Sequence, residues 1–142
     1  MKVLIDTNVA LNILLHQPIF FASSKKVFDL AETGLFAAFI STSAITDIYY
    51  IASKKLGNKV ARENIKHHLL QVFKPATVTD THIYQALDLE WDDFEDSVQY
   101  IVGESFAADY IITRNAKDFG SGSIPAVTPE EFLQAIITDS SN

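Results

Sequence analysis

The sequence predicts an α/β fold, a three-layer α/β/α sandwich whose central, mainly parallel sheet has four to five strands. Short apolar runs of strand length alternate along the chain with longer segments whose apolar residues recur every three or four positions, the period of a helix. The run at 35–40 has no polar alternation, which is typical of a strand covered on both faces, as in parallel sheets. One parallel sheet with helices on both sides is therefore the simplest arrangement.

The first half of the chain begins with a strand and carries clear helix boundaries. Pro18 and Gly34 end the first two predicted helices, the hydroxyl residues at 41–43 offer N-caps to the third, and Gly57 ends it. The expected elements are a strand at 3–5, helices at 9–15 and 20–33, a strand at 35–40, and helices at 44–56 and 58–71.

The second half continues the alternation. Pro75 and the two residues before it are expected to end the helix at 58–71, and Thr128 and Pro129 form a strong helix start. The expected elements are a strand at 77–79, helices at 80–89 and from Asp93 to about Phe106, a strand within 108–113, a polar loop at 114–119, a strand at 126–127 and a helix to about Ile137. We expect a single domain over 1–138 and a frayed tail at 139–142.

The composition of the 142 residues is that of an ordinary globular protein, with 48% hydrophobic and 20% charged residues. Cysteine is absent, so disulfides and thiolate metal sites are excluded, and any metal would need oxygen or histidine ligands. No signal peptide or long apolar run is present, which favours a cytoplasmic protein without a membrane segment. The net charge of −7 opposes a polyanionic partner, unless the excess acids surround a divalent cation.

Asp6 is the anchor of the predicted site, because it follows the first apolar run directly. In open α/β sheets, ligands bind outside the carboxyl ends of the strands, so an acid there faces a functional crevice. A purely structural alternative is that Asp6 caps the following helix. The other acids favour the functional interpretation.

Three further acidic positions are expected at the same edge of the sheet. Asp47 lies one turn into the helix that follows the second strand, and Asp96 lies near the start of a later helix. Asn115 and Asp118 come just past the strand within 108–113. Each has a structural alternative in helix-end electrostatics, capping or turn formation. Asp92 and Glu95 are expected to point outward into solvent, and Asp109 to lie at the opposite end of its strand.

Several carboxylates in a small volume repel one another, and a hard divalent cation with oxygen ligands, Mg²⁺ or Mn²⁺, relieves that repulsion. Such a site lowers the pKa of water and stabilises charge on a phosphoryl group. The reaction that this chemistry suits is phosphodiester hydrolysis. No glycine-rich phosphate loop or serine nucleophile motif competes with this interpretation.

Four segments in order resemble the PIN domain family, many members of which are VapC-like toxins of bacterial toxin-antitoxin pairs. The segments are Leu4-Ile-Asp-Thr-Asn-Val9, Ile40-Ser-Thr-Ser-Ala-Ile-Thr-Asp-Ile48, Asp93-Phe-Glu-Asp-Ser-Val-Gln99 and Ala108-Asp-Tyr-Ile-Ile-Thr-Arg-Asn-Ala-Lys-Asp-Phe119. The resemblance extends to about Phe132. It implies a Mg²⁺- or Mn²⁺-dependent ribonuclease, an RNA substrate, a homodimer and a possible antitoxin partner.

The resemblance also assigns roles to residues. Asp6, Asp47 and Asp96 match metal-binding acids, although toxin members usually have Glu where Asp47 stands. Asp118 is the nearby carboxylate for the fourth acidic position, which Asn115 matches by sequence, and both remain open. The predicted catalytic residues are Asp6, Asp47, Asp96 and Asp118. The predicted substrate-binding residues are Thr7, Asn8, Thr113, Arg114 and Asn115.

Two alternatives predict different chemistry. A phosphatase of the haloacid dehalogenase type also begins with a strand ending in Asp, but it usually needs an acid two residues on, where this chain has Asn8. A non-catalytic binding module of the same fold would have lost its metal site at Asp47 and Asn115. Binding of Mn²⁺ separates both alternatives from the ribonuclease.

Overall fold

The computed structural model describes residues 1–140 and has a five-stranded sheet at its centre. The strands are β1 (Lys2–Ile5), β2 (Ala37–Ser41), β3 (Phe73–Ala76), β4 (Tyr110–Ile112) and β5 (Ala126–Val127). Their order in space is β3-β2-β1-β4-β5, and every neighbouring pair is parallel. The predicted α/β class with a parallel sheet of four to five strands is therefore confirmed.

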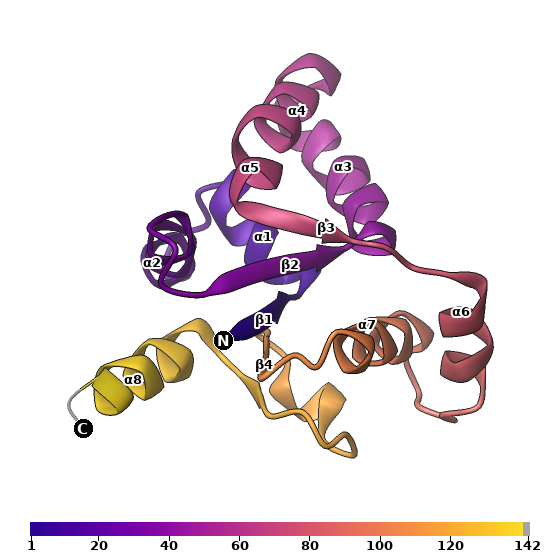
Figure 1. Ribbon diagram of the computed structural model, residues 1–142. Helices are drawn as coiled ribbons and strands as arrows, with labels where there is room; N and C mark the ends of the chain where they lie inside the picture. The colour runs from indigo at the N-terminus through magenta and orange to yellow at the C-terminus, as the bar shows by residue number, and fades with distance from the viewer. Residues whose placement is uncertain (141–142) are drawn as a thin grey trace.

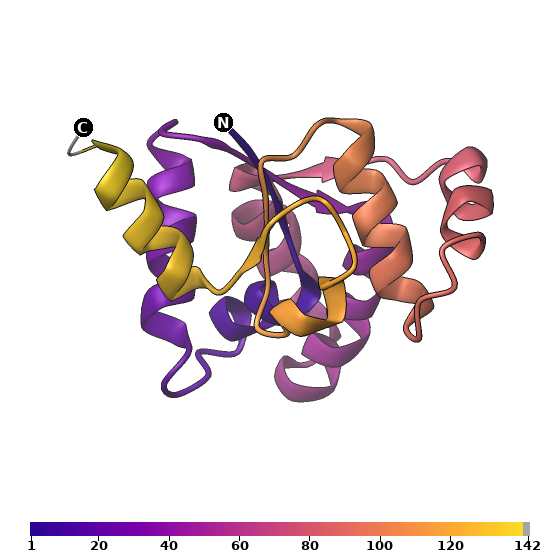
Figure 2. The same ribbon diagram turned by 90° about the horizontal axis from the view of Figure 1, so that it is seen from below.

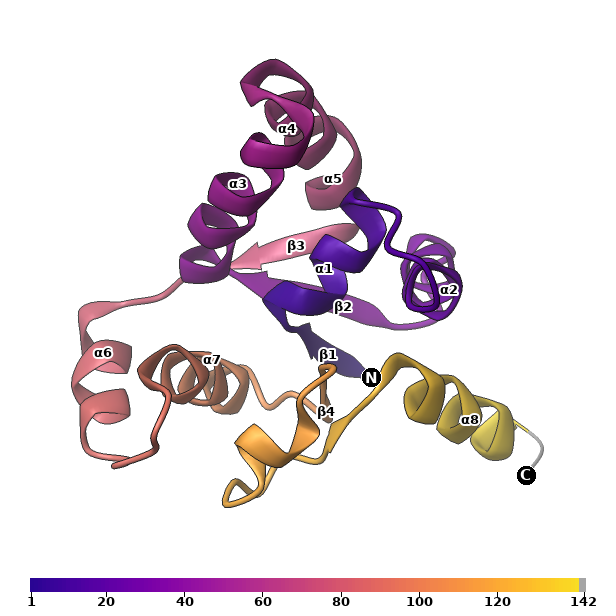
Figure 3. The same cartoon turned by 180° about the vertical axis from the view of Figure 1, so that it is seen from behind.

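Helices cover both faces of the sheet (Figures 1 and 3). They are α1 (Thr7–Leu14), α2 (Phe21–Glu32), α3 (Thr42–Leu56), α4 (Asn58–Asn64), α5 (Leu70–Val72), α6 (Asp80–Leu87), α7 (Phe94–Ser105) and α8 (Pro129–Ser140), with a π-helical turn η1 (Ile65–Leu69) and a 3₁₀ turn η2 (Ala116–Phe119). Helices α1 to α5 lie on one face, and α7 lies on the other with α6 outside it. Figure 2 shows α8 beside α2 at the end of the molecule farthest from α6.

The alternation of side chains along β1 explains the two layers of core. Val3 and Ile5 are fully buried on the side of α1 to α5, whereas Leu4 is fully buried on the side of α7. Successive side chains of a strand point to opposite faces, so an uninterrupted apolar run must be covered on both. The same apolar character at Ile111 and Ile112 places β4 in the two cores.

The strand order reverses between β1 and β4, and this position determines where a ligand can bind. The chain builds outward from β1 through β2 to β3, then crosses back to place β4 and β5 on the other side of β1. In doubly wound sheets the crevice lies outside the carboxyl ends of the strands at this switch point. Asp6 lies there, directly after β1, and its backbone N–H donates to the carbonyl of Ile112 in β4.

The third strand is where the sequence prediction was wrong. The strand expected at 77–79 is displaced to Phe73–Ala76, a segment that was expected only to end a helix. Phe73 is fully buried and fixes this segment against the core. Pro75 is compatible with it, because β3 is an edge strand and pairs only with β2.

The helix expected at 58–71 is not continuous, because η1 separates α4 from α5. Helix α8 runs to Ser140, three residues beyond the expected end, so residues 139 and 140 of the expected frayed tail are helical. Residues 141 and 142 of that tail lie outside the described residues. No helix within residues 1–140 combines the length and the apolar character needed to cross a bilayer.

Candidate functional site

A cavity of about 360 Å³ opens at the carboxyl ends of β1 and β4, and we call it the acid cavity. The carboxylates that line it are Asp6, Asp47, Asp93, Glu95, Asp96 and Asp118. No lysine, arginine or histidine of the described part of the chain lines it. Acids from four separate segments are thus brought together without a protein cation to neutralise them.

Asp6 forms the floor of the acid cavity and is only 6% exposed. It is the N-cap of α1, where its Oδ1 accepts from the backbone N–H of Thr7 at 2.7 Å. The Gln99 side-chain amide donates to the same oxygen at 2.8 Å, and the Thr113 hydroxyl donates to Oδ2 at 2.6 Å. Burial raises the pKa of Asp6 above its ordinary value, although these hydrogen bonds act in the opposite direction.

Asp47 reaches the acid cavity from α3, one and a half turns after the Ser41 N-cap, and meets Glu95 there. Burial, together with hydrogen bonding to Asp47 and repulsion from Asp47 and Asp6, raises the pKa of Glu95 to about 7. The Thr7 hydroxyl donates to Glu95 Oε1 at 3.3 Å. The expectation that Glu95 points outward into solvent was therefore wrong.

Asp96 enters the acid cavity from the first turn of α7, whose N-cap is Asp93. The Asp93 side chain accepts from the Asp96 backbone N–H at 3.0 Å, so the capping that was the structural alternative for Asp96 is present. Burial raises the pKa of Asp96 to about 7, with further contributions from the charges of Asp6, Asp93 and Asp118. Structural capping by Asp93 and exposure of Asp96 to the cavity are thus compatible.

The segment after β4 brings both candidates for the fourth acidic position to the acid cavity. Asn115 and Asp118 both line it, and Asp118 is close enough to affect the pKa of Asp96. Asp118 lies on η2, which the buried Phe119 fixes to the core. Asp109 lies at the opposite end of β4, where its carboxylate accepts from the backbone N–H of Lys2, as expected.

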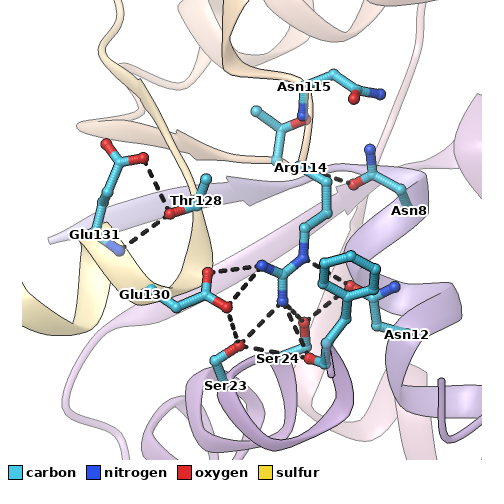
Figure 4. A network of polar contacts seen from close by, with 11 residues as sticks. Asn8, Asn12, Ser23, Ser24, Arg114, Asn115, Thr128, Glu130 and Glu131 are labelled. Atoms are coloured by element: carbon cyan, nitrogen blue, oxygen red, sulfur yellow. Dashed lines mark hydrogen bonds and ion pairs between the residues drawn. The ribbon is translucent and has the colours of Figure 1, made fainter. Parts of the chain in front are cut away.

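The predicted substrate-binding residues divide into three groups. Thr7, Asn8 and Asn115 line the acid cavity, whereas Thr113 is fully buried behind Asp6. Arg114 does not line the acid cavity, and its guanidinium extends toward α2 and α8 (Figure 4). It forms an ion pair with Glu130 and donates to acceptors of Phe20, Ser23, Ser24 and Asn12. The structure therefore gives Arg114 a packing role between helices.

Two residues of the site were missed by the sequence reasoning. Glu95 carries its carboxylate into the acid cavity, and Gln99, only 1% exposed, donates to Asp6 from the next turn of α7. Asp96 and Gln99 are three residues apart and so share a helix face, as do Glu95 and Gln99 at a spacing of four. A glutamine at that spacing from the two acids was the signal available in the sequence.

The donor set of the acid cavity suits a hard divalent cation, because it consists of oxygen atoms without thiolate or imidazole. Burial, and after it repulsion from the neighbouring carboxylates, raises the pKa of Glu95 and of Asp96, and a cation would offset that repulsion. Within residues 1–140, no three acidic or histidine side chains already form a metal-ligand set. The more exposed carboxylates would therefore have to rotate toward Asp6 to bind an ion.

Comparison of the sequence with known proteins identifies its family. A family model for the PIN domain matches residues 2–117. Ribonuclease VapC1 of Aquifex aeolicus (strain VF5) is 28% identical over 137 residues, which cover 94% of this chain and 94% of that protein.

Solved structures are similar in fold. VapC20 of Mycobacterium tuberculosis, described as a Sarcin-Ricin loop cleaving toxin, gives a TM-score of 0.69 at 13% identity, over 84% of this chain and 95% of that one. VapBC2 of Rickettsia felis, bound to a DNA fragment from its promoter, gives a TM-score of 0.67 at 14% identity, over 89% of this chain and 97% of that one. A toxin-antitoxin complex from Klebsiella pneumoniae gives a TM-score of 0.65 at 20% identity, over 89% of this chain and 97% of that one. With the family model matching most of the sequence, and the fold and the acids in the predicted places, the chain belongs to the PIN domain family.

Proposed function

We propose that this protein is a Mg²⁺- or Mn²⁺-dependent ribonuclease, the toxin of a toxin-antitoxin pair. The observation that carries the proposal is the meeting of six carboxylates at the switch point of a parallel sheet, with no protein cation among the described residues that line the cavity. Similarity over 94% of the chain to a protein named Ribonuclease VapC1 supports the same reaction.

Asp6, Asp47 and Asp96 are the residues that would hold the ion, and Glu95 and Asp118 lie within the same cavity. A bound Mg²⁺ or Mn²⁺ would lower the pKa of water and stabilise negative charge on a phosphoryl group. Asp47 is one methylene shorter than the Glu usual in toxin members. Glu95, which interacts with Asp47, has the longer side chain and brings a carboxylate to the same part of the cavity.

The other residues of the site orient the acids and the substrate. Thr113 and Gln99 hold the two oxygens of Asp6 in fixed directions, which preorganises the most buried ligand. Asn8 and Asn115 line the cavity on the side of β4 and can donate hydrogen bonds to phosphate or ribose oxygens of RNA.

Cleavage of a mixed pool of single-stranded and structured RNA in the presence of Mn²⁺ tests the proposal. We expect Asp6→Asn and Asp96→Asn each to reduce cleavage at least about 100-fold, since each removes a charged ligand. Asp88→Asn, a matched change at the exposed C-cap aspartate of α6 outside the acid cavity, should leave cleavage unchanged. Calorimetry should detect Mn²⁺ binding to the native protein and much weaker binding to Asp6→Asn.

The two alternatives predict other results. A binding module with a lost metal site would neither cleave RNA nor bind Mn²⁺. A haloacid dehalogenase-type phosphatase would form an aspartyl-phosphate, and membership of the PIN domain family argues against it. Metal-independent cleavage that survives both substitutions would contradict the proposed chemistry.

We propose an antitoxin protein as the partner, because solved structures of the same fold include toxin-antitoxin complexes. An antitoxin would insert a lysine or arginine among the acids of the cavity. Co-expression with the neighbouring gene should yield a complex that is inactive toward RNA. We also propose a homodimer in the cytoplasm, which light scattering of the purified protein and fractionation of cells test directly.

A further inference from the structure

A second cavity adjoins the acid cavity on the side of the loop between α1 and α2. It has a volume of about 400 Å³, within the range of about 300–1,000 Å³ typical of small-molecule sites. Asn8 and Asn115 line both cavities, so the two are neighbours. The remaining walls include Gln17, Pro18 and Phe20 from the loop, together with Arg114. We call this cavity the loop pocket.

The loop pocket offers no free positive charge to a phosphate. Arg114 is its only charged lining residue among those described, and its guanidinium is already bound by the protein. Both oxygens of Glu130 accept from one guanidinium nitrogen at 2.8 and 2.6 Å, and the Asn12 side-chain oxygen accepts from Nε at 3.0 Å (Figure 4). A neutral ligand group therefore fits this pocket better than an anion does.

Three side-chain amides of the pocket remain for a ligand: Asn115 offers both its oxygen and its N–H groups, whereas Asn8 and Gln17 offer N–H groups. The side-chain oxygen of Asn8 accepts from the Arg114 backbone N–H at 3.2 Å, and the side-chain oxygen of Gln17 accepts from the Asn12 amide. In the described part of the chain, the amide nitrogens of Asn8 and Gln17 donate no hydrogen bond to protein. Both side chains are therefore oriented to present donors.

Phe20 supplies an aromatic surface in the same pocket. Its ring lies 4.7 Å from the guanidinium carbon of Arg114, and the residue is 43% exposed. The preceding Ile19 has a φ of 76°, which a β-branched residue rarely adopts, so the loop holds Phe20 in place at some conformational cost. Unstacked RNA bases bind to aromatic rings and arginine planes arranged in this way.

We propose that the loop pocket binds the base of the RNA nucleotide beside the phosphate in the acid cavity, and that it prefers bases with a carbonyl group on the edge that they present. Donors from Asn8 and Gln17 match the carbonyl oxygen of uracil or guanine, whereas cytosine and adenine present an amino group at the same position. This inference rests on the proposed function, since it deepens the recognition of RNA by the same site.

Binding of four RNA octamers by the native protein, with Ca²⁺ in place of Mg²⁺, tests the inference with the proposed metal ligands intact and without Mg²⁺- or Mn²⁺-dependent cleavage. Uridine against cytidine, and inosine against adenosine, each compare a carbonyl with an amino group on the same ring. We expect fluorescence anisotropy to show that the uridine and inosine octamers bind about tenfold more tightly than the cytidine and adenosine octamers do. Gln17→Ala should abolish most of that preference. Phe20→Ala should weaken the binding of all four octamers about tenfold.

Matched controls and a conservative variant keep this test decisive. Gln85→Ala and Tyr84→Ala change an exposed glutamine and an exposed aromatic residue on α6, away from both cavities, and should leave affinity and preference unchanged. Phe20→Trp keeps an aromatic ring over Arg114 and should retain binding even if Phe20→Ala loses stability. Equal binding of the four octamers, no binding, or a preference that survives Gln17→Ala would overturn the inference. A base preference without Mn²⁺-dependent cleavage by the native protein would instead overturn the proposed catalysis alone.

Discussion

Asp6 combines two roles that the sequence presented as alternatives. It caps α1, and it is also the one buried carboxylate in residues 1–140. The capping hydrogen bond uses Oδ1, while Oδ2 is held by the hydroxyl of Thr113. A side chain with two oxygens can satisfy a helix end and still be oriented toward the cavity that it lines. Evidence for a cap is therefore no evidence against a metal ligand at this position.

Thr113→Val tests whether the orientation of Asp6 matters for activity. The valine side chain has nearly the same shape but removes the donor to Asp6 Oδ2 and the acceptor of the Asn115 backbone N–H. We expect Mn²⁺ affinity or cleavage to fall about 10- to 100-fold, as is usual when the group that orients a metal ligand is lost. Thr113→Ser keeps the hydroxyl and should restore most of the activity. Equal activity of the Val and Ser variants would assign Thr113 to packing alone.

The sequence predicted which acids meet at the carboxyl edge of the sheet, but it failed where burial decided the direction of a side chain. Asp6, Asp47, Asp96 and Asp118 were placed correctly because the fold brings those positions to one edge of the sheet. Glu95 was placed wrongly because the helical pattern of α7 does not decide whether a residue of its first turn faces solvent or the acid cavity. Only the position of α3, which carries Asp47, determines that Glu95 faces another acid.

At the scale of elements, the network around Arg114 connects parts of the chain that are far apart in sequence. Arg114 follows β4, and its guanidinium bonds Asn12 at the end of α1, Ser24 in α2 and Glu130 in α8 (Figure 4). Partial burial acts to raise the pKa of Glu130, but hydrogen bonds from Arg114 and Ser23 lower it to about 2. The network therefore docks two helices onto the end of a strand.

Arg114→Lys should reduce the free energy of unfolding by about 1–3 kcal/mol, because lysine cannot reproduce the planar set of donors to the buried Asn12 and Ser24. Glu130→Gln should cost less, at most about 1 kcal/mol, since Glu130 is half exposed. Urea unfolding of both variants measures the difference. An Arg114→Lys protein with native stability and lost cleavage would contradict the packing role and assign Arg114 to RNA.

The elements that the sequence predicted poorly are those whose form depends on distant contacts. Residues 58–71 have a helical pattern, but nothing in it marks the π-helical turn η1. The segment Phe73–Ala76 contains a proline and reads as a helix end, and it becomes a strand because Phe73 packs edge to face on Phe28 of α2. Strand pairing and core packing overrode local preference in that segment. Strands β1, β4 and β5 were predictable because their apolar runs are short and bounded by polar residues.

At the scale of the whole molecule, the net charge of −7 has a structural location. Six of the 18 acidic residues line the acid cavity. The charge that opposes RNA is therefore concentrated where a divalent cation would neutralise it, and the composition is compatible with a polyanionic substrate. The same concentration of charge destabilises the metal-free protein, because repulsion among the acids is present in the fold and largely absent from the unfolded chain.

The stability of the metal-free protein should therefore fall as the pH rises from about 5 to about 8. The pKa of Glu95 and of Asp96 is about 7 in the fold, against ordinary values of 4.5 and 3.8. A raised pKa means that the folded state binds these protons more tightly than the unfolded chain does. The resulting stabilisation of the fold is fully present below the ordinary pKa values and is lost as the pH rises through about 7. Glu130, with its lowered pKa, has the opposite effect, but only below about pH 4.5.

Thermal unfolding in a chelator across this range measures the effect, and the double variant Glu95→Gln/Asp96→Asn provides the comparison. We expect the melting temperature of the native protein to decline with pH and that of the variant to change little. Saturating Mn²⁺ at pH 8 should raise the melting temperature of the native protein by several degrees, as expected for a ligand at about 100 times its Kd, and leave the variant nearly unaffected. Parallel pH profiles for both proteins would mean that repulsion in the acid cavity does not limit stability, and the electrostatic argument for a cation at this site would lose its basis.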